Sequence, residues 1–200
     1  MNKKFLLASA MISLLLVGCS TQNSENSVGS SSSAPMGMDS SKMAVSVTND
    51  QFDAEFATLI KDYFTAVEEK DFAGYQATVY PPYQEAYGEF LENNGDTLES
   101  AFNQMHGSFD EDGYDSWHFT QLDLDYCEKE DIDNFFDMYQ KGGIFDEAFE
   151  EKCRKDAKEI RDIQFSLYAL YEGDEEATPV AREMEIIVLR TQDGKCYLFG

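Results

Sequence analysis

The sequence is poor in positive charge. Its 200 residues contain 15 lysines and arginines against 39 aspartates and glutamates, which gives a formal net charge of −24 at pH 7. A surface of this sign repels the phosphates of nucleic acids and anionic lipid headgroups. We therefore expect no nucleic-acid partner. Two alternatives stay open: the charge attracts a cationic partner, or it serves only solubility.

The sequence also lacks the short motifs that carry common chemistry. It has no glycine-rich phosphate loop and no HExxH, CxxC or GxSxG pattern. The acidic run over residues 110–115 fails as an EF-hand loop, because alignment on Asp112 and Gly113 places Phe119 where a bidentate glutamate is required. We therefore expect neither a metal site nor a cofactor.

Histidine is scarce, with only His106 and His118 available as a general acid or base. Side chains alternate between the two faces of a strand, so His118 and Asp123 are expected on opposite faces of the strand that carries them. His118 and Tyr126 share a face there but lie roughly 26 Å apart. A non-catalytic domain is therefore expected, and the alternative is an isomerase- or dehydratase-like enzyme with a pocket His or Asp as general base.

No apolar run is long enough to cross a bilayer comfortably. The longest covers residues 5–17 and would span roughly 20 Å as a helix, whereas a membrane core needs about 20 residues. Lys3 and Lys4 precede the run and small residues follow it. This arrangement is typical of a secretory signal peptide, here over residues 1–18.

The end of that segment, Leu16-Val17-Gly18-Cys19, resembles the bacterial lipobox, in which a small residue precedes an invariant cysteine. The resemblance implies a diacylglyceryl group on Cys19, which becomes the lipidated N-terminus of a lipoprotein. The domain would then lie on the extracytoplasmic side of a bacterial cell membrane. Two or more acyl chains, with about 0.8 kcal/mol per buried methylene, hold a protein there stably. An ordinary signal peptide with a chance cysteine is the alternative.

Residues 19–50 are rich in serine and contain no aromatic residue. Such a segment buries too little apolar surface to offset the entropy of ordering it. We predict a flexible linker with a root-mean-square span of about 30 Å. Residues 51–200 are then a single domain.

The domain sequence changes from helical to strand periodicity along its length. Helical spacing of apolar residues predicts helices over 52–67, 71–80, 83–93, 97–109, 130–141 and 144–153. Alternation predicts strands over 116–128, 163–171, 182–191 and 195–199, the last two joined by an Asp193-Gly194 hairpin turn. The order favours an α+β domain, with N-terminal helices packed on one face of a curved, mainly antiparallel sheet.

The stretch YFTAVEEKDFAGYQATVYPP and the final TQDGKCYLF hairpin resemble the nuclear-transport-factor-2-like (cystatin-like) superfamily, and its members that follow lipoprotein signals. The resemblance implies a cone-shaped cavity between helices and sheet, with Tyr75, Tyr80 and Trp117 as candidate ligand contacts near its mouth. The ligand or partner is left open as a small molecule, a peptide or an envelope protein.

With Cys19 lipidated, three cysteines remain, Cys127, Cys153 and Cys196. Exported proteins can form disulfides. Cys127 ends one predicted strand and Cys153 precedes the next, so we predict a bond between these two. It would close a loop of about 26 residues and contribute about 3.5 kcal/mol in the chain-entropy model. The alternative is three free, buried thiols.

Overall fold

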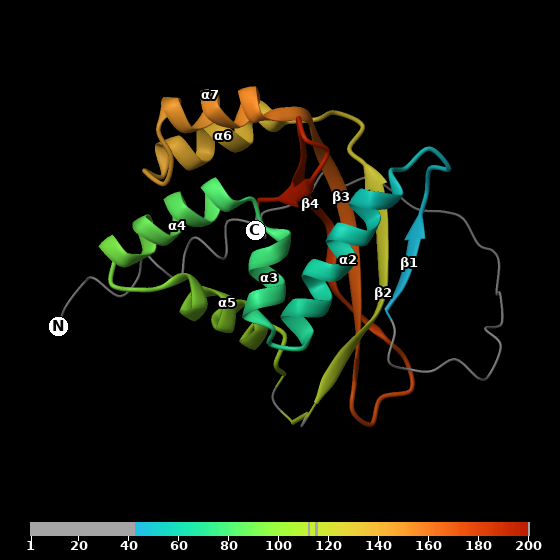
Figure 1. Ribbon diagram of the computed structural model, residues 1–200. Coiled ribbons are helices and arrows are strands. Elements are labelled where there is room, and N and C mark those ends of the chain that lie inside the picture. The colour runs from blue at the N-terminus through green and yellow to red at the C-terminus, as the bar shows by residue number, and fades with distance from the viewer. Residues whose placement is uncertain (1–42, 112, 115, 200) are drawn as a thin grey trace.

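The computed structural model describes residues 43–111, 113–114 and 116–199 (Figure 1). These residues form an α+β domain, as predicted. Its helices are α2 (Ala54–Glu68), α3 (Phe72–Thr78), α4 (Pro81–Asn93), α5 (Leu98–Gly107), α6 (Ile132–Lys141) and α7 (Glu147–Asp156). Its strands are β1 (Ala44–Val47), β2 (Trp117–Tyr126), β3 (Ala157–Tyr171), β4 (Thr178–Thr191) and β5 (Cys196–Leu198).

The five strands form one sheet in the order β1-β2-β3-β4-β5. The pairs β2–β3, β3–β4 and β4–β5 are antiparallel, and only β1 runs parallel to its neighbour β2. The predicted hairpin joins β4 to β5, with Gly194 at a φ of 88°, where a residue without a Cβ is favoured. The mainly antiparallel sheet is therefore confirmed.

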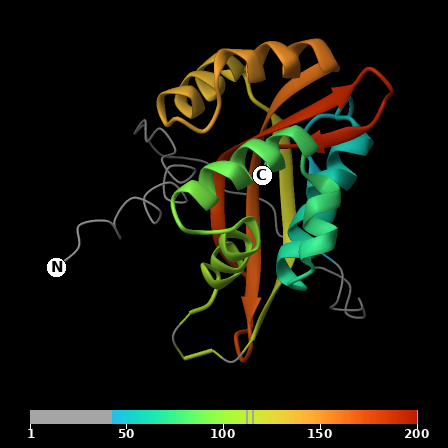
Figure 2. The same cartoon turned by 60° about the vertical axis from the view of Figure 1, so that its left-hand side comes forward.

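Helices α2, α3, α4 and α5 lie on one side of the sheet, and α6 and α7 lie together at one end of it (Figures 1 and 2). Helix α2 presents Phe56, Ile60 and Phe64, all buried, toward the sheet. The Phe64 ring lies 5.9 Å from Phe119 on β2 and 5.1 Å from Phe165 on β3. Each such side chain contributes about 1.5–3 kcal/mol through removal from water, so this contact fixes the helix layer on the sheet.

A second aromatic cluster joins α4 to α6, α7 and the C-terminal residues. Tyr83 is 1% exposed, and its ring lies 5.6 Å from Phe145 and 5.7 Å from Phe199. Phe199 also lies 5.2 Å from Phe135 on α6. Phe199, which directly follows β5, therefore packs between α4 and α6 and joins the two groups of helices.

Strand β1 corrects the predicted end of the linker. Ala44–Val47 pairs with β2, from Ala44 opposite Gln121 to Val47 opposite Leu124, and Met43 beside it is 5% exposed. All four strand residues, Ala-Val-Ser-Val, are exposed, so the strand is held mainly by backbone pairing. An apolar run this short inside a serine-rich segment does not by itself predict a strand. The rest of the linker, the predicted signal peptide and Cys19 lie outside the described residues. No helix among the described residues is long and apolar enough to span a membrane.

A shift in register corrects the predicted faces of β2. Phe119 pairs with Ala169 and Gln121 with Tyr168, so one residue between them is unpaired. Phe119 and Leu122 are therefore both buried under the helices, at 2% and 0% exposure. Strict alternation would have placed them on opposite faces. As a consequence His118 lies on the same face as Asp123 and on the face opposite Tyr126. Both placements are the reverse of the prediction, because the unpaired residue shifts the alternation by one position.

Candidate functional site

The space between the helices and the sheet, where the resemblance implied a cavity, is filled by side chains. Eight large side chains there are no more than 2% exposed: Phe56, Ile60, Phe102, Phe119, Leu122, Leu124, Ile163 and Leu167. Two hollows on the described surface lie elsewhere. One of about 460 Å³ is lined by residues of α5 and its N-terminal cap, and one of about 260 Å³ by residues of α2, α3 and their connection.

Tyr75 and Tyr80, predicted at the mouth of a cavity, are instead part of the core. Tyr75 is 4% exposed and its ring lies 4.9 Å from Phe102. Tyr80 is 3% exposed, and its hydroxyl donates a hydrogen bond to Asp156 Oδ2 at 3.0 Å. Burial is the main reason that the pKa of each phenol is raised. Neither side chain is presented to a ligand.

Trp117 and His106 pack against each other with ring centroids 5.0 Å apart. The indole Nε1 donates to Asp110 Oδ1 at 2.9 Å. His106 is 8% exposed, and its Nδ1 lies 2.8 Å from the Val67 carbonyl oxygen. A carbonyl only accepts, so Nδ1 carries the proton. The imidazole thus joins α5 to α2 and faces no carboxylate or tyrosine hydroxyl at that nitrogen.

His118 is half-buried and influences Glu68, at the end of α2, electrostatically. The two side chains form no ion pair, and Glu68 Oε2 accepts instead from the Phe119 backbone N–H at 2.6 Å. Burial raises the pKa of Glu68, while the hydrogen bond and His118 oppose the shift. The structure therefore brings neither histidine into the arrangement expected of a general acid–base pair.

Cys127, Cys153 and Cys196 are free thiols, so the predicted disulfide between Cys127 and Cys153 is not formed. Cys153 is fully buried on α7 next to the Tyr80 hydroxyl, and burial raises its pKa to about 12. Cys127 follows β2 and lies next to Asp162 on β3. The prediction paired Cys127 with Cys153 because each lies next to a strand in the sequence. In the fold the two thiols have different neighbours, Asp162 for Cys127 and Tyr80 for Cys153.

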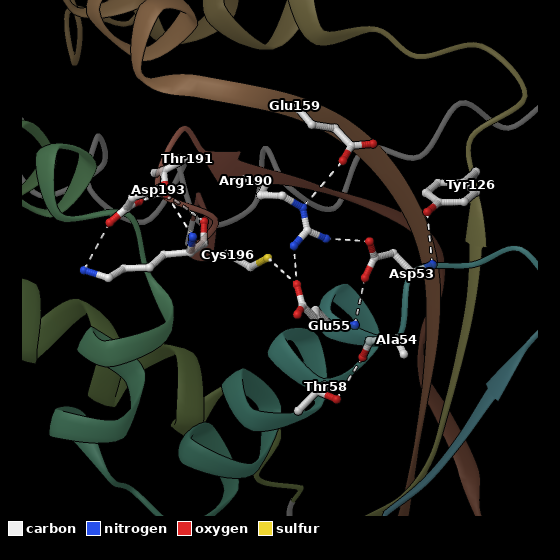
Figure 3. Close-up of polar contacts among 11 residues, drawn as sticks. Asp53, Ala54, Glu55, Thr58, Tyr126, Glu159, Arg190, Thr191, Asp193 and Cys196 are labelled. Atoms are coloured by element: carbon white, nitrogen blue, oxygen red, sulfur yellow. Dashed lines mark hydrogen bonds and ion pairs between the residues drawn. The ribbon is translucent and has the colours of Figure 1, made fainter.

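Figure 3 shows a group of charged residues around Arg190 that the sequence did not predict. Arg190, near the end of β4, is 13% exposed and pairs with Asp53 Oδ2 at 2.5 Å and with Glu55. Its Nε lies 3.7 Å from Glu159 on β3, and its guanidinium lies 5.0 Å from the centre of the Phe56 ring. Carboxylates surround this cation, so it is not available to an anionic ligand.

The same group fixes the start of α2. Asp53 Oδ1 accepts from the Glu55 backbone N–H at 2.8 Å as the N-cap, and the Asp53 N–H donates to the Tyr126 hydroxyl at 3.2 Å. The Cys196 sulfur lies 3.7 Å from Glu55 Oε2. These contacts join α2 to β2, β4 and β5, and we assign the Arg190 group a structural role.

The side of the sheet away from α2 carries polar residues, and we call it the open sheet face. On β2 they alternate with buried Leu122 and Leu124, and the register places Asp123 opposite Ser166, Asp125 opposite Gln164, and Gln164 opposite Glu185. The polar residues of this face are Gln121, Asp123, Asp125, Gln164, Ser166 and Glu185, all exposed or half-exposed, and the register also places Tyr168 and Leu170 on it. Within the described residues none of its three carboxylates forms an ion pair.

One end of this face holds a cluster of Cys127, Asp162 and Glu185. One ligand atom from each, a sulfur or a carboxylate oxygen, lies within 4.8 Å of the others. Asp162 is 1% exposed, and its Oδ1 has no hydrogen-bond partner. Burial is the main reason that the pKa values of all three groups are raised, and the charge of Asp162 adds to the shift of Cys127 and of Glu185. A hydrogen bond between the Cys127 thiol and the Asp162 carboxylate raises the pKa of the thiol further and opposes the rise in the pKa of Asp162. The sequence prediction of no metal site did not consider these residues together.

No family model matches the chain, and neither a curated protein nor a solved structure is significantly similar to it. The fold defines an α+β domain with one filled and one open sheet face. The inferences that follow depend on the sequence and on this geometry.

Proposed function

We propose that the protein is a non-catalytic, membrane-anchored lipoprotein whose open sheet face binds a basic segment of another cell-envelope protein. The observation that carries this proposal is the contrast between the two sides of the sheet. The helix side is filled by apolar side chains, whereas the open sheet face carries carboxylates without ion-pair partners.

Charge complementarity selects a cationic partner. Asp123 and Asp125 are half-exposed, and Glu185 is exposed. Asp123 accepts from the Gln121 side chain at 2.7 Å and Asp125 from the Tyr126 backbone N–H at 2.8 Å. Neither hydrogen bond neutralises a carboxylate. Lysine and arginine side chains would, and the net charge of −24 would steer such a partner toward the protein.

The lipid anchor and the fold family are parts of the same proposal. The lipobox-like segment ending at Cys19 supports attachment to the extracytoplasmic side of a bacterial membrane, where a basic partner segment would be met. The long helix α2 on a mainly antiparallel sheet and the final β4–β5 hairpin support a nuclear-transport-factor-2-like domain. In this proposal the space between helices and sheet serves as core rather than as a ligand site.

The test is binding of a fluorescent lysine-rich decapeptide to the full chain in detergent, measured by anisotropy, with a glutamine-rich decapeptide as the uncharged probe. We expect the lysine-rich peptide to bind and the glutamine-rich peptide not to bind. The double substitution Asp123→Asn and Asp125→Asn should weaken binding roughly 10-fold, since two exposed charge pairs are worth about 0.7 kcal/mol each.

The matched control is Glu89→Gln with Glu92→Gln on α4, which removes the same charge from two exposed positions on the helix side. It should change the affinity less than 2-fold. Equal losses in both double variants would show that only net charge is sensed. Absence of lysine-peptide binding, or such equal losses, would contradict the proposal.

A further inference from the structure

Independently of the proposed partner, we propose that Cys127, Asp162 and Glu185 form a binding site for one divalent transition-metal ion of the zinc type. Nothing in the sequence suggested this site, because its members come from three different parts of the chain. The structure places them at one end of the open sheet face.

Sheet register brings the three side chains together. The Cys127 backbone N–H donates to the Asp162 carbonyl oxygen at 3.2 Å, which continues the β2–β3 pairing beyond the end of β2. Asp162 pairs with Ile187, and Glu185 is two residues from Ile187 on β4. Residues two apart on a strand share a face, so Asp162 and Glu185 point to the same side, where their ligand atoms and the Cys127 sulfur lie within 4.8 Å.

The donor set fits zinc-type ions. Thiolate sulfur and carboxylate oxygen are both ligands of Zn²⁺, whereas Mg²⁺ and Ca²⁺ prefer oxygen alone. Bonds of about 2.0–2.3 Å in a tetrahedral site keep ligand atoms roughly 3.5 Å apart. The exposed Glu185 side chain has room to move its carboxylate from within 4.8 Å of the other two ligand atoms to this shorter spacing. Binding would release the Cys127 thiol proton to solvent, and a fourth position would remain for water or another ligand.

An unpartnered buried carboxylate is the independent observation that points to a cation. Asp162 Oδ2 accepts from the Asp131 backbone N–H at 3.2 Å, whereas Oδ1, in a residue only 1% exposed, has no hydrogen-bond partner of ordinary geometry. The thiol of Cys127 is the side-chain hydrogen-bonding neighbour of this carboxylate, and a metal ion would take the place of the thiol proton. Buried polar atoms in native proteins are nearly always satisfied, and an exception calls for an explanation such as an ion. A metal ion would satisfy this carboxylate.

The neighbouring charges do not supply that cation. Glu130 and Asp131, the nearby groups that act on Asp162 electrostatically, are also acidic. Arg161 is next to Asp162 in sequence, but it bonds to Glu130 and Glu159 and its guanidinium lies 5.3 Å from the centre of the Tyr126 ring. The local charge is therefore negative, and it favours a divalent ion.

The experiment is a Co²⁺ titration of the full chain in detergent, after chelator treatment and with a phosphine reductant. Co²⁺ replaces Zn²⁺, and its bond to a thiolate gives a charge-transfer band in the near ultraviolet. We expect one equivalent to bind with this band. Cys127→Ser should abolish the band, and Glu185→Gln should weaken Co²⁺ binding more than the 10- to 100-fold that follows loss of an outer-shell group.

Two variants serve as matched controls. Cys196→Ser removes another half-exposed thiol that lies beside a glutamate, and Glu176→Gln removes an exposed carboxylate in the turn between β3 and β4. Both should retain the band and the affinity. Asp162→Asn should lose Co²⁺ binding as well. If that variant does not fold, Cys127→Ser and Glu185→Gln still decide, because their positions are less buried.

Two results would overturn the proposal. One is a wild-type chain that takes up no stoichiometric Co²⁺. The other is a charge-transfer band that persists in Cys127→Ser, which would place the metal on a different thiol. Neither result depends on whether the lysine-rich peptide binds, because the peptide test varies Asp123 and Asp125 and the metal test varies other residues.

Discussion

At the residue scale, most buried polar side chains in the described part of the chain have a definite partner. His106 bonds to the Val67 carbonyl, Tyr80 to Asp156, and the Thr78 hydroxyl donates to the Tyr75 carbonyl at 2.8 Å. Asp162 differs, because one of its oxygens has none. Structural hydrogen bonds thus explain His106, Tyr80 and Trp117, three of the residues first considered for catalysis or ligand contact. Asp162 attracted no attention in the sequence, although it is the residue whose surroundings favour a cation.

Glu68 provides a pH-dependent prediction at this scale. Burial raises its pKa, with Glu69 acting in the same direction and the Phe119 N–H and His118 acting against it. Between the unfolded glutamate pKa of about 4.3 and the raised native pKa, the native state binds more protons than the unfolded chain. Stability therefore falls as pH rises through this window. Glu68→Gln should therefore gain stability relative to wild type as pH rises above the unfolded glutamate pKa of about 4.3.

Denaturant unfolding of the full chain at a series of pH values from below the unfolded glutamate pKa up to neutral pH measures the difference. The glutamine side chain in Glu68→Gln would keep an acceptor for the Phe119 N–H, so the comparison isolates the charge. Glu69→Gln, at the exposed neighbouring position, is the control and should follow the wild-type pH dependence. Identical pH dependence in wild type and Glu68→Gln would show the prediction to be wrong.

At the element scale, polar contacts determine where helices begin and how they meet the sheet. The helix predicted over 83–93 starts two residues too late, because Pro81 and Pro82 open α4, where proline at the first helical positions is favoured. Helix α2 begins at Ala54, two residues later than the predicted start at residue 52, with Asp53 as its N-cap. Asp53 is selected because Arg190 and Tyr126 hold it in place.

Arg190→Met tests this connection between α2 and β4. Removal of one partner from a fully buried ion pair costs about 3–5 kcal/mol, whereas exposed pairs are worth about 0–1 kcal/mol. Arg190 is 13% exposed, but Asp53 and Glu55 are 33% and 67% exposed. We therefore expect a loss of about 2 kcal/mol in the free energy of unfolding, measured by denaturant titration.

Arg154→Met is the matched control for Arg190→Met. Arg154 also contacts two carboxylates and lies over a phenylalanine ring, but it is 41% exposed. Its loss should cost less than about 1 kcal/mol. Equal destabilisation by the two substitutions would mean that burial of Arg190 adds nothing to the pairing.

At the scale of the whole molecule, the sheet separates a filled side from an acidic one. The helices supply the core, whereas the polar residues of the open sheet face are exposed or half-exposed among the described residues. In the proposed function, a membrane anchor would hold this face near the membrane surface. The anchor and the open sheet face would then act together, because attachment restricts the search for a partner to the membrane surface.

The anchor itself is tested by Cys19→Ser in a bacterial host. We expect wild type in the membrane fraction, with an N-terminal peptide whose mass includes acyl chains. The variant should lose this modification, because serine has no thiol for the thioether bond. A Cys196→Ser chain should remain in the membrane. Membrane retention and unchanged processing of Cys19→Ser would contradict the lipoprotein prediction.

The sequence by itself predicted the α+β class, the order of helices before most strands, and the Asp193-Gly194 hairpin. These features depend on local periodicity and turn chemistry, which act between residues close in the chain. Strand β1 was missed because it is only four residues long, lies in a serine-rich segment, and pairs with β2 in a parallel, non-local arrangement. The register shift after Phe119 was missed because alternation alone cannot locate an unpaired residue.

Tertiary structure alone decided both candidate sites. Cys127, Asp162 and Glu185 meet only because β2, β3 and β4 pair in one particular register, and no spacing along the chain reveals that meeting. The same holds for Arg190 with Asp53 and Glu55, which are more than a hundred residues away. Local sequence sets which side chains a strand can present, but long-range pairing sets which of them share a space.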